Sequence, residues 1–528
     1  RRPTKMQTSQ TPRSPEPARA GWRLGLLSFL SMLALATFLA GCQPASPAPT
    51  PTPLPTVTPW PTASPEAARP LPTPRATPTL RVEVSPTPPR PVPILYAMND
   101  SRNTDWREVN PAYGPVGSHI RFFWEQVNPA PGVFDWSRVD AYLQAAAQQR
   151  VRLRSGEEAP KPVLLAVGIY SAWAPGWDYH HYDHAPQWLY QTMGRPQLGG
   201  RYVGYLLEPE GCTPTSAPMY DDPAYQEAFR AMVLALGQRY NRDPRVGAVL
   251  IANGIDDESR AIVSKACKQY DDALAQYVTP QEYDEFVLKT IDWYRQAFPD
   301  KPVFLQPAAA IWQHRKRYVD YAVSRTPPVG IKMNGLAPDE GSWFGYKSLA
   351  GMGMMELVDA YRDQTLIAFE PKLYYPLDEF AYWTLLAGLA HWPDFIDVQA
   401  APDGGNGFLR HLPNIPGLAQ FVEENLGTRL ETASQVWIVL RDTELPKELY
   451  NGYGSGEYGD WDRGLRRPEG LPGNGTVLVK REELPPQAQA QPYGRQCRRT
   501  DEATGNTEMS FDVDDRFPYA GRTPLAQD

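Results

Sequence analysis

Short apolar runs alternate with amphipathic helical patterns along residues 94–416. Continuous apolar runs fit strands buried on both faces, as in a parallel sheet covered by helices. Eight such runs occur, and we predict strands at Ile94–Met98, His119–Trp124, Val163–Ile169, Val246–Ala252, Val303–Gln306, Gly330–Met333, Leu366–Phe369 and Phe395–Val398. This number of βα units predicts an α/β fold, a (β/α)8 TIM barrel with enlarged loops. A doubly wound open sheet is the alternative.

Two helices between these strands carry clear start signals. Asp222-Pro223 precedes a helical pattern in which Tyr225, Phe229, Met232, Val233 and Leu236 share one face. The run Thr279-Pro280-Gln281-Glu282 forms a capping box with proline at the first helical position. Its helix should bury Tyr283, Phe286, Val287, Ile291 and Tyr294. Both patterns support βα units.

Carboxylates follow two of the predicted strands. The run Val246–Ala252 opens into Asn253-Gly254 and then into Asp256, Asp257 and Glu258, and the seventh strand ends at Glu370. In (β/α)8 barrels the active site lies at the carboxyl ends of the strands. Hydrolysis of a glycosidic bond requires two carboxyl groups at the active site, and these residues could provide them.

The second βα unit has a more specific pattern. Residues 119–146 read H-I-R-F-F-W-E-Q-V-N-P-A-P-G-V-F-D-W-S-R-V-D-A-Y-L-Q-A-A. This resembles the corresponding unit of retaining glycoside hydrolases of clan A, especially β-galactosidase-like members. The matching residues are Arg121, Trp124, Pro129, Gly132, Phe134 and Asp135. Ala185–Leu189 is similar to the Pro-x-Trp segment that follows the third strand in that group.

The resemblance implies roles for two glutamates. In that clan the nucleophile ends the seventh strand, which corresponds to Glu370, with Glu340 as the alternative. The acid/base glutamate ends the fourth strand directly after an asparagine, but here Gly254 follows Asn253. The nearest glutamate is Glu258, which we predict as acid/base. Asp256 and Asp257 remain alternatives for the proton donor.

A retaining mechanism places the two carboxyl groups about 5–5.5 Å apart, so that one attacks while the other protonates the leaving oxygen. The nucleophile must be ionised, so a cation should face Glu370, and Arg121 is the candidate. Tryptophan faces are platforms for sugar rings. The residues predicted to bind the substrate are Arg121, Trp124, Trp173, Trp177, His180, His181, Asn253, Asn334 and Trp343.

We expect neither a cofactor nor a metal. The run H-H-Y-D-H at residues 180–184 offers a metal site as the alternative, but consecutive loop residues rarely all reach one ion. The net charge of −8 is spread without long basic blocks, which argues against a nucleic-acid partner. An oligo- or polysaccharide is the expected substrate.

The N-terminal residues 1–42 predict a bacterial lipoprotein signal peptide. A basic flank precedes the apolar core Leu24–Leu39, and Leu39–Cys42 resembles a lipobox, which implies lipidation at Cys42. An ordinary anchor helix is the alternative. Residues 43–93 are rich in proline and threonine and predict an extended linker. We therefore expect an exported protein that is lipid-anchored to the cell membrane.

Oxidising surroundings predict a disulfide between Cys212 and Cys267, which lie in neighbouring loops. Residues 429–528 carry short strand-like runs among turns and predict a small β-sandwich-like domain. The chain ends soon after residue 515, so we expect this domain to be incomplete. Two rivals to the glycoside hydrolase stay open: a non-catalytic carbohydrate-binding lipoprotein on a degenerate barrel, and a cell-envelope scaffold that binds no sugar.

Overall fold

The computed structural model describes twelve stretches of the chain. They are residues 90–98, 114–171, 182–262, 269–308, 314–337, 354–371, 378–399, 408–440, 461–466, 477–479, 497–505 and 507–517. The predicted signal peptide with Cys42, and residues 43–89 of the predicted linker, lie outside these stretches. Within them, none of the helices combines the length and apolar character that crossing a bilayer requires.

Eight parallel strands close into a barrel. They pair in the order β1-β16-β15-β14-β13-β12-β5-β2, and β2 pairs with β1 to complete the ring. In chain order they are β1 (Leu95–Met98), β2 (Val116–Phe123), β5 (Val163–Gly168), β12 (Val246–Ile251), β13 (Val303–Leu305), β14 (Gly330–Leu336), β15 (Ile367–Pro371) and β16 (Phe395–Gln399). Each predicted strand forms, so the (β/α)8 fold is confirmed and the open sheet is excluded.

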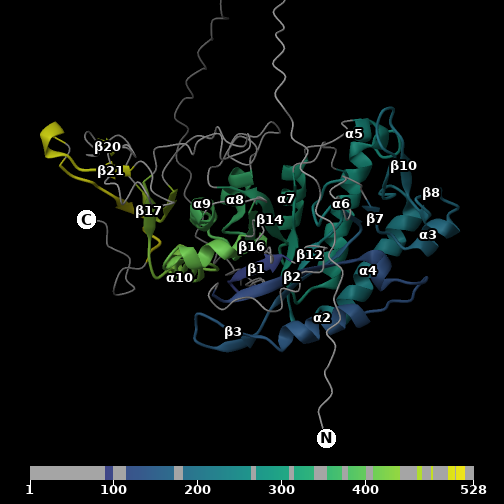
Figure 1. The fold of residues 1–528 in the computed structure, drawn as a ribbon, viewed down its shortest axis with the longest axis horizontal. Helices are drawn as coiled ribbons and strands as arrows, with labels where there is room; N and C mark the ends of the chain where they lie inside the picture. Colours follow the sequence, from purple (N-terminus) through teal and green to yellow (C-terminus); the bar gives the residue numbers. More distant parts are fainter. Residues whose placement is uncertain are drawn as a thin grey trace, which may run out of the picture. The chain divides into compact units, whose positions relative to one another are not determined.

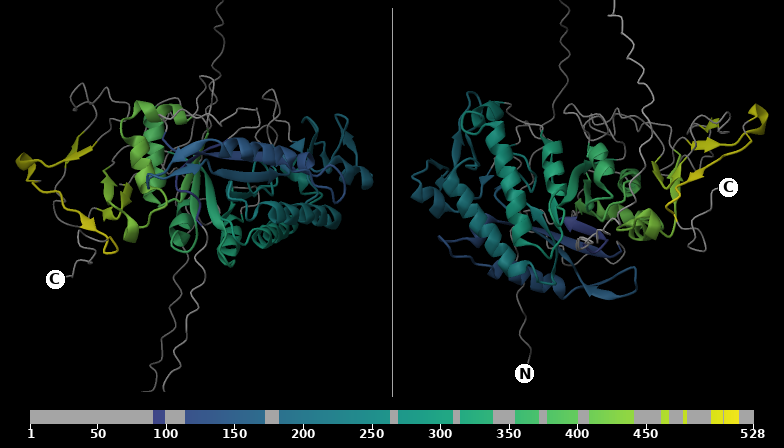
Figure 2. Two further views of the ribbon diagram at one scale, coloured as in Figure 1. Left: turned by 90° about the horizontal axis from the view of Figure 1, so that it is seen from below. Right: turned by 180° about the vertical axis from the view of Figure 1, so that it is seen from behind.

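Helices lie around these strands in the views of Figures 1 and 2. They are α1 (Trp124–Val127), α2 (Ser137–Ala147), α3 (Gln187–Thr192), α4 (Pro223–Tyr240), α5 (Gln269–Leu274), α6 (Pro280–Ala297), α7 (Arg315–Val323), α8 (Met354–Tyr361), α9 (Asp378–Ala390) and α10 (Leu418–Asn425). The capping box of α6 forms as predicted, and the predicted apolar faces of α4 and α6 are buried. Burial of these faces fixes each helix against the sheet.

Short hairpins enlarge the connections that follow β2 and β5. They are β3 (Arg150–Arg152) with β4 (Glu158–Pro160), β6 (Tyr170–Ser171) with β7 (Tyr182–Asp183), β8 (Gln197–Leu198) with β9 (Arg201–Tyr202), and β10 (Tyr205–Leu207) with β11 (Thr215–Ala217). The pair β6–β7 follows β5 directly. It therefore places its residues near the carboxyl ends of the barrel strands.

The amino-terminal half of the barrel interior is packed with aromatic rings. The rings of Tyr96 and Phe304 each contact Phe395 edge-on, with centroids 5.1 and 4.9 Å apart. A Cβ atom on Gly117 or Gly330 would come within 2.5–2.7 Å of the ring of Tyr96 or Phe304. These glycines make room for the rings. The amino-terminal end of the barrel is thus closed by packed rings, and any substrate must approach from the carboxyl-terminal end.

The C-terminal residues form separate two-stranded pairs. They are β17 (Trp437–Val439) with β18 (Trp461–Arg463), β19 (Leu465–Arg466) with β22 (Asp512–Val513), and β20 (Val477–Val479) with β21 (Cys497–Arg499). The buried guanidinium of Arg463 donates to the backbone oxygens of Leu389 and Thr428 at 2.9 and 3.0 Å. These bonds join β18 to the barrel side. The predicted β-sandwich is not confirmed by the described pairs and stays a prediction.

Candidate active site

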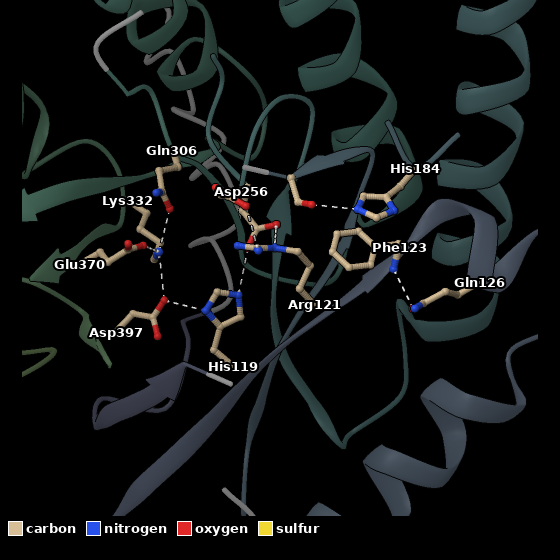
Figure 3. A network of polar contacts seen from close by, with 12 residues as sticks. His119, Arg121, Phe123, Gln126, His184, Asp256, Gln306, Lys332, Glu370 and Asp397 are labelled. Atoms are coloured by element: carbon tan, nitrogen blue, oxygen red, sulfur yellow. Dashed lines mark hydrogen bonds and ion pairs between the residues drawn. The ribbon is translucent and has the colours of Figure 1, made fainter. Parts of the chain in front are cut away.

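Polar side chains line the barrel interior at the carboxyl ends of its strands. Side chains alternate along a strand, so Ala368 and Glu370 share the inner face of β15, and Phe395 and Asp397 share that of β16. On both strands an apolar residue is followed two positions later by a carboxylate. The amino-terminal part of the barrel interior is therefore apolar, and its carboxyl-terminal end, the barrel mouth, is charged. Figure 3 shows the resulting network.

Lys332 of β14 lies at the centre of this network. Its side chain is completely buried, and its ammonium group donates to Glu370, to Gln306 Oε1 at 2.7 Å and to Asp397 Oδ2 at 2.9 Å. Burial alone would lower the pKa of Lys332, but the charges of Glu370 and Asp397 outweigh it and raise the pKa. The ammonium group therefore stays charged at neutral pH and holds two carboxylates in the barrel mouth.

The carboxyl group of Glu370 is the one group of this trio that reaches solvent, with a side chain 15% exposed. Burial raises its pKa, and Lys332 opposes this effect. The charges of Asp397 and Glu258 raise it further, so the net shift is upward. Because the charge of Glu258 acts on Glu370, the two glutamates predicted to be catalytic lie in one electrostatic environment.

Glu258 reaches the same region from the loop after β12. Asn334 donates to its Oε1 atom, and Arg260 donates to its Oε2 atom through Nε at 2.8 Å and through a second nitrogen. Asn334 is also the register partner of Glu370 across β14 and β15. Neighbouring strands are about 4.8 Å apart. Asn334 therefore links the Glu258 carboxylate to the strand position beside Glu370.

The cation that faces Glu370 differs from the one predicted. Arg121 donates to Asp257 at 2.6 Å and to Asp256 at 3.4 Å, and Lys332 takes the place beside Glu370. Burial lowers the pKa of Arg121, but Asp257 and Asp256 raise it more, and Glu370 adds a smaller effect. Arg121 thus acts on Glu370 only at longer range, because two loop carboxylates lie closer to it.

Asp256 and Asp257, the alternative proton donors, belong to a strained loop. Both have left-handed backbones, with φ of 51° and 68°. Non-glycine residues in this region cost free energy and often mark functional loops. Burial raises the pKa of Asp257, but Arg121 and His119 lower it by more, so the net shift is downward. Asp257 is therefore ionised and unsuited to donate a proton.

Gly254 occupies the position directly after Asn253, where the sequence resemblance led us to expect a glutamate. A Cβ atom there would lie 2.3 Å from the Glu258 carbonyl oxygen and 2.4 Å from that of Arg260. The loop also folds back through a bond from the Ile255 amide to the Arg260 carbonyl at 3.0 Å. The space of the expected side chain is thus filled by backbone. The loop brings Glu258 to the mouth instead.

His119 lies between two carboxylates in the barrel. Its Nδ1 atom is 2.7 Å from Asp397, its Nε2 atom is 3.4 Å from Asp257, and the side chain is 1% exposed. Burial lowers its pKa, but Asp397 and Asp257 reverse this effect and raise it. Burial raises the pKa of Asp397, but His119 and Lys332 reverse this effect and lower it. His119 therefore connects Asp257 to Asp397, and Lys332 connects Asp397 to Glu370.

Replacing His119 with asparagine should remove a pH-dependent part of the stability. A group whose folded pKa is raised contributes stability that is complete below its unfolded pKa of about 6.5 and is lost as pH rises through the folded pKa. The difference in unfolding free energy between the wild type and His119→Asn should therefore shrink from acidic to alkaline pH. Urea unfolding between pH 5.5 and 9 measures this difference, and a constant difference contradicts the assignment.

Two predicted substrate-binding residues are buried instead. Trp124 is 0% exposed, and its ring nitrogen donates to Asn128 at 3.1 Å. Asn253 is also 0% exposed, donates to Thr290 at 2.6 Å and accepts from Ser259 at 3.0 Å. Both side chains therefore have structural roles, because their polar groups are used inside the protein.

The remaining predicted residues divide by position. Asn334 and Arg121 reach the barrel mouth, and Cys212 is disulfide-bonded. Several predicted residues lie outside the described stretches, so their roles stay predictions: Cys42, Trp173, Trp177, His180, His181, Cys267, Glu340 and Trp343. In the part of the chain that the structure describes, no group of three or more His, Cys, Asp or Glu side chains is arranged to hold a metal ion.

Lys332, His119 and Asp397 were missed by the sequence reasoning. Each is a charged or titratable residue inside a mostly apolar strand, as in Gly330-Ile331-Lys332-Met333 and Phe395-Ile396-Asp397-Val398. Charged residues are almost never fully buried unless they are paired. Their presence within strands was therefore a signal for a buried network, although pairing partners cannot be read from the strands themselves.

Comparison with known proteins gives only distant similarities. No protein-family model matches the chain, and no curated protein matches it. Among solved structures, a β-galactosidase from the psychrophilic Marinomonas ef1 has a TM-score of 0.38 at 13% identity, over 62% of this chain and 59% of that chain. The present chain thus spans less than two thirds of the length of that enzyme.

Two further solved structures are similar at the same level. Endo-glycoceramidase II from Rhodococcus sp. has a TM-score of 0.34 at 14% identity, over 62% of this chain and 81% of that chain. The xylanase TsXylA from Thermoanaerobacterium saccharolyticum has a TM-score of 0.33 at 9% identity, over 60% of this chain and 90% of that chain. The barrel assignment itself rests on the strand order described above.

Proposed function

We propose that the protein is a glycoside hydrolase that acts on an oligo- or polysaccharide by a retaining double displacement. Glu370 is the nucleophile, and Glu258 is the acid/base. The observation that carries this proposal is the convergence of the two carboxylates: Asn334 binds Glu258 beside the strand position of Glu370, and the charge of Glu258 acts on Glu370.

The surroundings of Glu370 suit a nucleophile. The ammonium group of Lys332 contacts its carboxyl group and favours the ionised form that attacks the anomeric carbon. The pKa of Glu370 is nevertheless raised overall, which makes its carboxylate, once ionised, more basic and so more nucleophilic. Glu258 lies in a loop, with a side chain 12% exposed, and can reach a leaving oxygen above the barrel mouth. Each carboxylate therefore has the access that its role requires.

A mechanism-based label tests this function. A panel of 2-deoxy-2-fluoro glycosides with dinitrophenolate leaving groups, one for each common sugar, should give a chain heavier by one fluoroglycosyl group with the matching member. The label should map to the peptide that contains Glu370, since the fluorine slows hydrolysis of the covalent intermediate. Glu370→Gln should stay unlabelled. Labelling of another carboxylate with Glu370 intact would contradict the assignment.

Gly254 favours a second candidate, a carbohydrate-binding protein without catalysis. The usual position of the acid/base residue is filled by loop backbone, and Arg260 occupies one oxygen of Glu258. For such a protein, a glycan array shows binding while the fluoroglycosides leave the chain unlabelled. A scaffold that binds no sugar leaves both experiments blank.

We also propose that the chain is exported and anchored through a lipid on Cys42. The support is the sequence alone, in which a basic flank, an apolar core and small residues precede this cysteine. In a bacterial host, Cys42→Ala should remove the lipid from the protein. The variant should then appear in the soluble fraction or as a precursor whose signal peptide is not cleaved. Unchanged fractionation and an unchanged mass would refute the lipid anchor.

A further inference from the structure

A serine, a histidine and a glutamate are hydrogen-bonded in series near Arg121. The Nε2 atom of His184 lies 2.9 Å from Ser171 Oγ, and its Nδ1 atom lies 2.9 Å from Glu125 Oε1. None of the three has a role in the proposed cleavage of glycosides. In Figure 3 the guanidinium group of Arg121 lies between Asp256 and the rings of Phe123 and His184.

The three residues come from separate segments that backbone bonds hold together. Ser171 ends β6 and lies opposite Tyr182 of β7, and His184 follows β7. The His184 amide donates to the Ile169 carbonyl at 2.8 Å, and the Glu125 amide donates to the His184 carbonyl at 2.9 Å. The order of the three groups is therefore built into the barrel rather than into one loop.

The imidazole ring is also fixed in orientation. The ring of Phe123 stacks on that of His184, with centroids 3.7 Å apart and planes 20° apart. Arg201 binds the second oxygen of Glu125 and holds this carboxylate in place. Locked rotamers of this kind are what a catalytic constellation needs.

The protonation pattern follows from these contacts. Burial raises the pKa of Glu125, but His184 and Arg201 lower it more, so Glu125 is an ionised acceptor. The Nδ1 atom of His184 must then carry the hydrogen that Glu125 accepts. Burial, together with the charges of Arg201 and Arg121, lowers the pKa of His184 more than Glu125 raises it, so the ring is neutral near pH 7. Its Nε2 lone pair faces the hydroxyl group of Ser171.

We propose that Ser171, His184 and Glu125 form a second catalytic centre, which hydrolyses esters of small carboxylic acids. Ser171 Oγ attacks the ester carbonyl carbon while its proton passes to His184 Nε2. The tetrahedral intermediate collapses, His184 protonates the leaving alkoxide, and the acyl group remains on Ser171. Water then attacks this acyl group, gives a proton to His184, and the carboxylic acid leaves as Ser171 regains its proton.

Two features define the substrate class. Ser171 is 4% exposed, which limits the acyl group to a small one such as acetyl. The positive charge of Arg121 acts on His184, and its side chain is 15% exposed, so it is the cation we assign to the developing oxyanion. This centre contains neither Glu258 nor Glu370. It therefore stands whether or not the protein cleaves glycosides.

The full chain is tested with a fluorophosphonate probe and with 4-nitrophenyl acetate. The probe should label the wild type once, and mass spectrometry should place the label on Ser171. Ser171→Ala should lose the label and about 10²-fold or more of the ester hydrolysis, as should His184→Gln. The matched control Ser137→Ala removes an exposed serine and should keep both.

The pH profile adds a second readout. The rate should rise as His184 loses its proton, with a midpoint below the usual imidazole pKa of about 6.5, because burial lowers the pKa of this ring. Absence of a label on wild-type Ser171 overturns the proposal, and this result does not depend on whether a variant folds. Equal ester hydrolysis by folded Ser171→Ala and Ser137→Ala overturns it as well.

Discussion

Glu370→Gln is expected to lower the turnover of a glycoside substrate by about 10⁴-fold. Glutamine cannot form the covalent glycosyl intermediate, yet its amide oxygen can still accept from Lys332, so the network around it should persist. Steady-state kinetics on the sugar identified by fluoroglycoside labelling measures the loss. Near-ultraviolet circular dichroism should show an unchanged fold.

Two companion variants sharpen this test. Glu258→Gln should lose about 10²–10⁴-fold on substrates with poor leaving groups but little of the first step on dinitrophenyl glycosides, because a good leaving group needs no proton. Glu227→Gln is the matched control, since its carboxylate is on the surface with a side chain 70% exposed. A folded Glu370→Gln variant that keeps activity within tenfold of Glu227→Gln refutes the role of Glu370.

Lys332→Met is expected to lower the free energy of unfolding by about 3–5 kcal/mol. The ammonium group is fully buried between Glu370 and Asp397, and its removal leaves these carboxylates without their shared cation. Methionine has nearly the same length, so lost packing contributes little. Urea unfolding measures the change.

A surface ion pair provides the control for this variant. Lys316 pairs with Asp320 at 2.5 Å on α7, but the two side chains are 51% and 41% exposed. Lys316→Met should change the free energy of unfolding by about 1 kcal/mol or less. Adding Glu370→Gln to Lys332→Met should recover part of the loss, because a neutral amide needs no counter-charge. Equal losses in Lys332→Met and Lys316→Met contradict the central role of Lys332.

The same substitution also predicts a shift in the pH profile. Lys332 lowers the pKa of Glu370, so its removal raises that pKa further. A nucleophile must be ionised, so the acid limb of the pH–rate profile should move upward in Lys332→Met.

Much of the fold was predictable because its signals are local. The predicted strand Val163–Ile169 is observed as Val163–Gly168, and the capping box at Thr279 begins α6 where expected. Burial on both faces requires apolar residues at consecutive positions, and a helix start requires a cap within four residues. Both requirements involve only residues that are close together in the chain, so the sequence shows them directly.

The candidate site was only half predictable for the opposite reason. The sequence alone determined that Glu370 ends a buried strand and that Glu258 follows another, because strand ends are local features. The tertiary structure decided which charges meet: Lys332 rather than Arg121 contacts Glu370, and Trp124 and Asn253 face the interior. Partners of a charge come from strands far apart in the chain. Their pairing depends on barrel closure and register, which no single stretch of residues records.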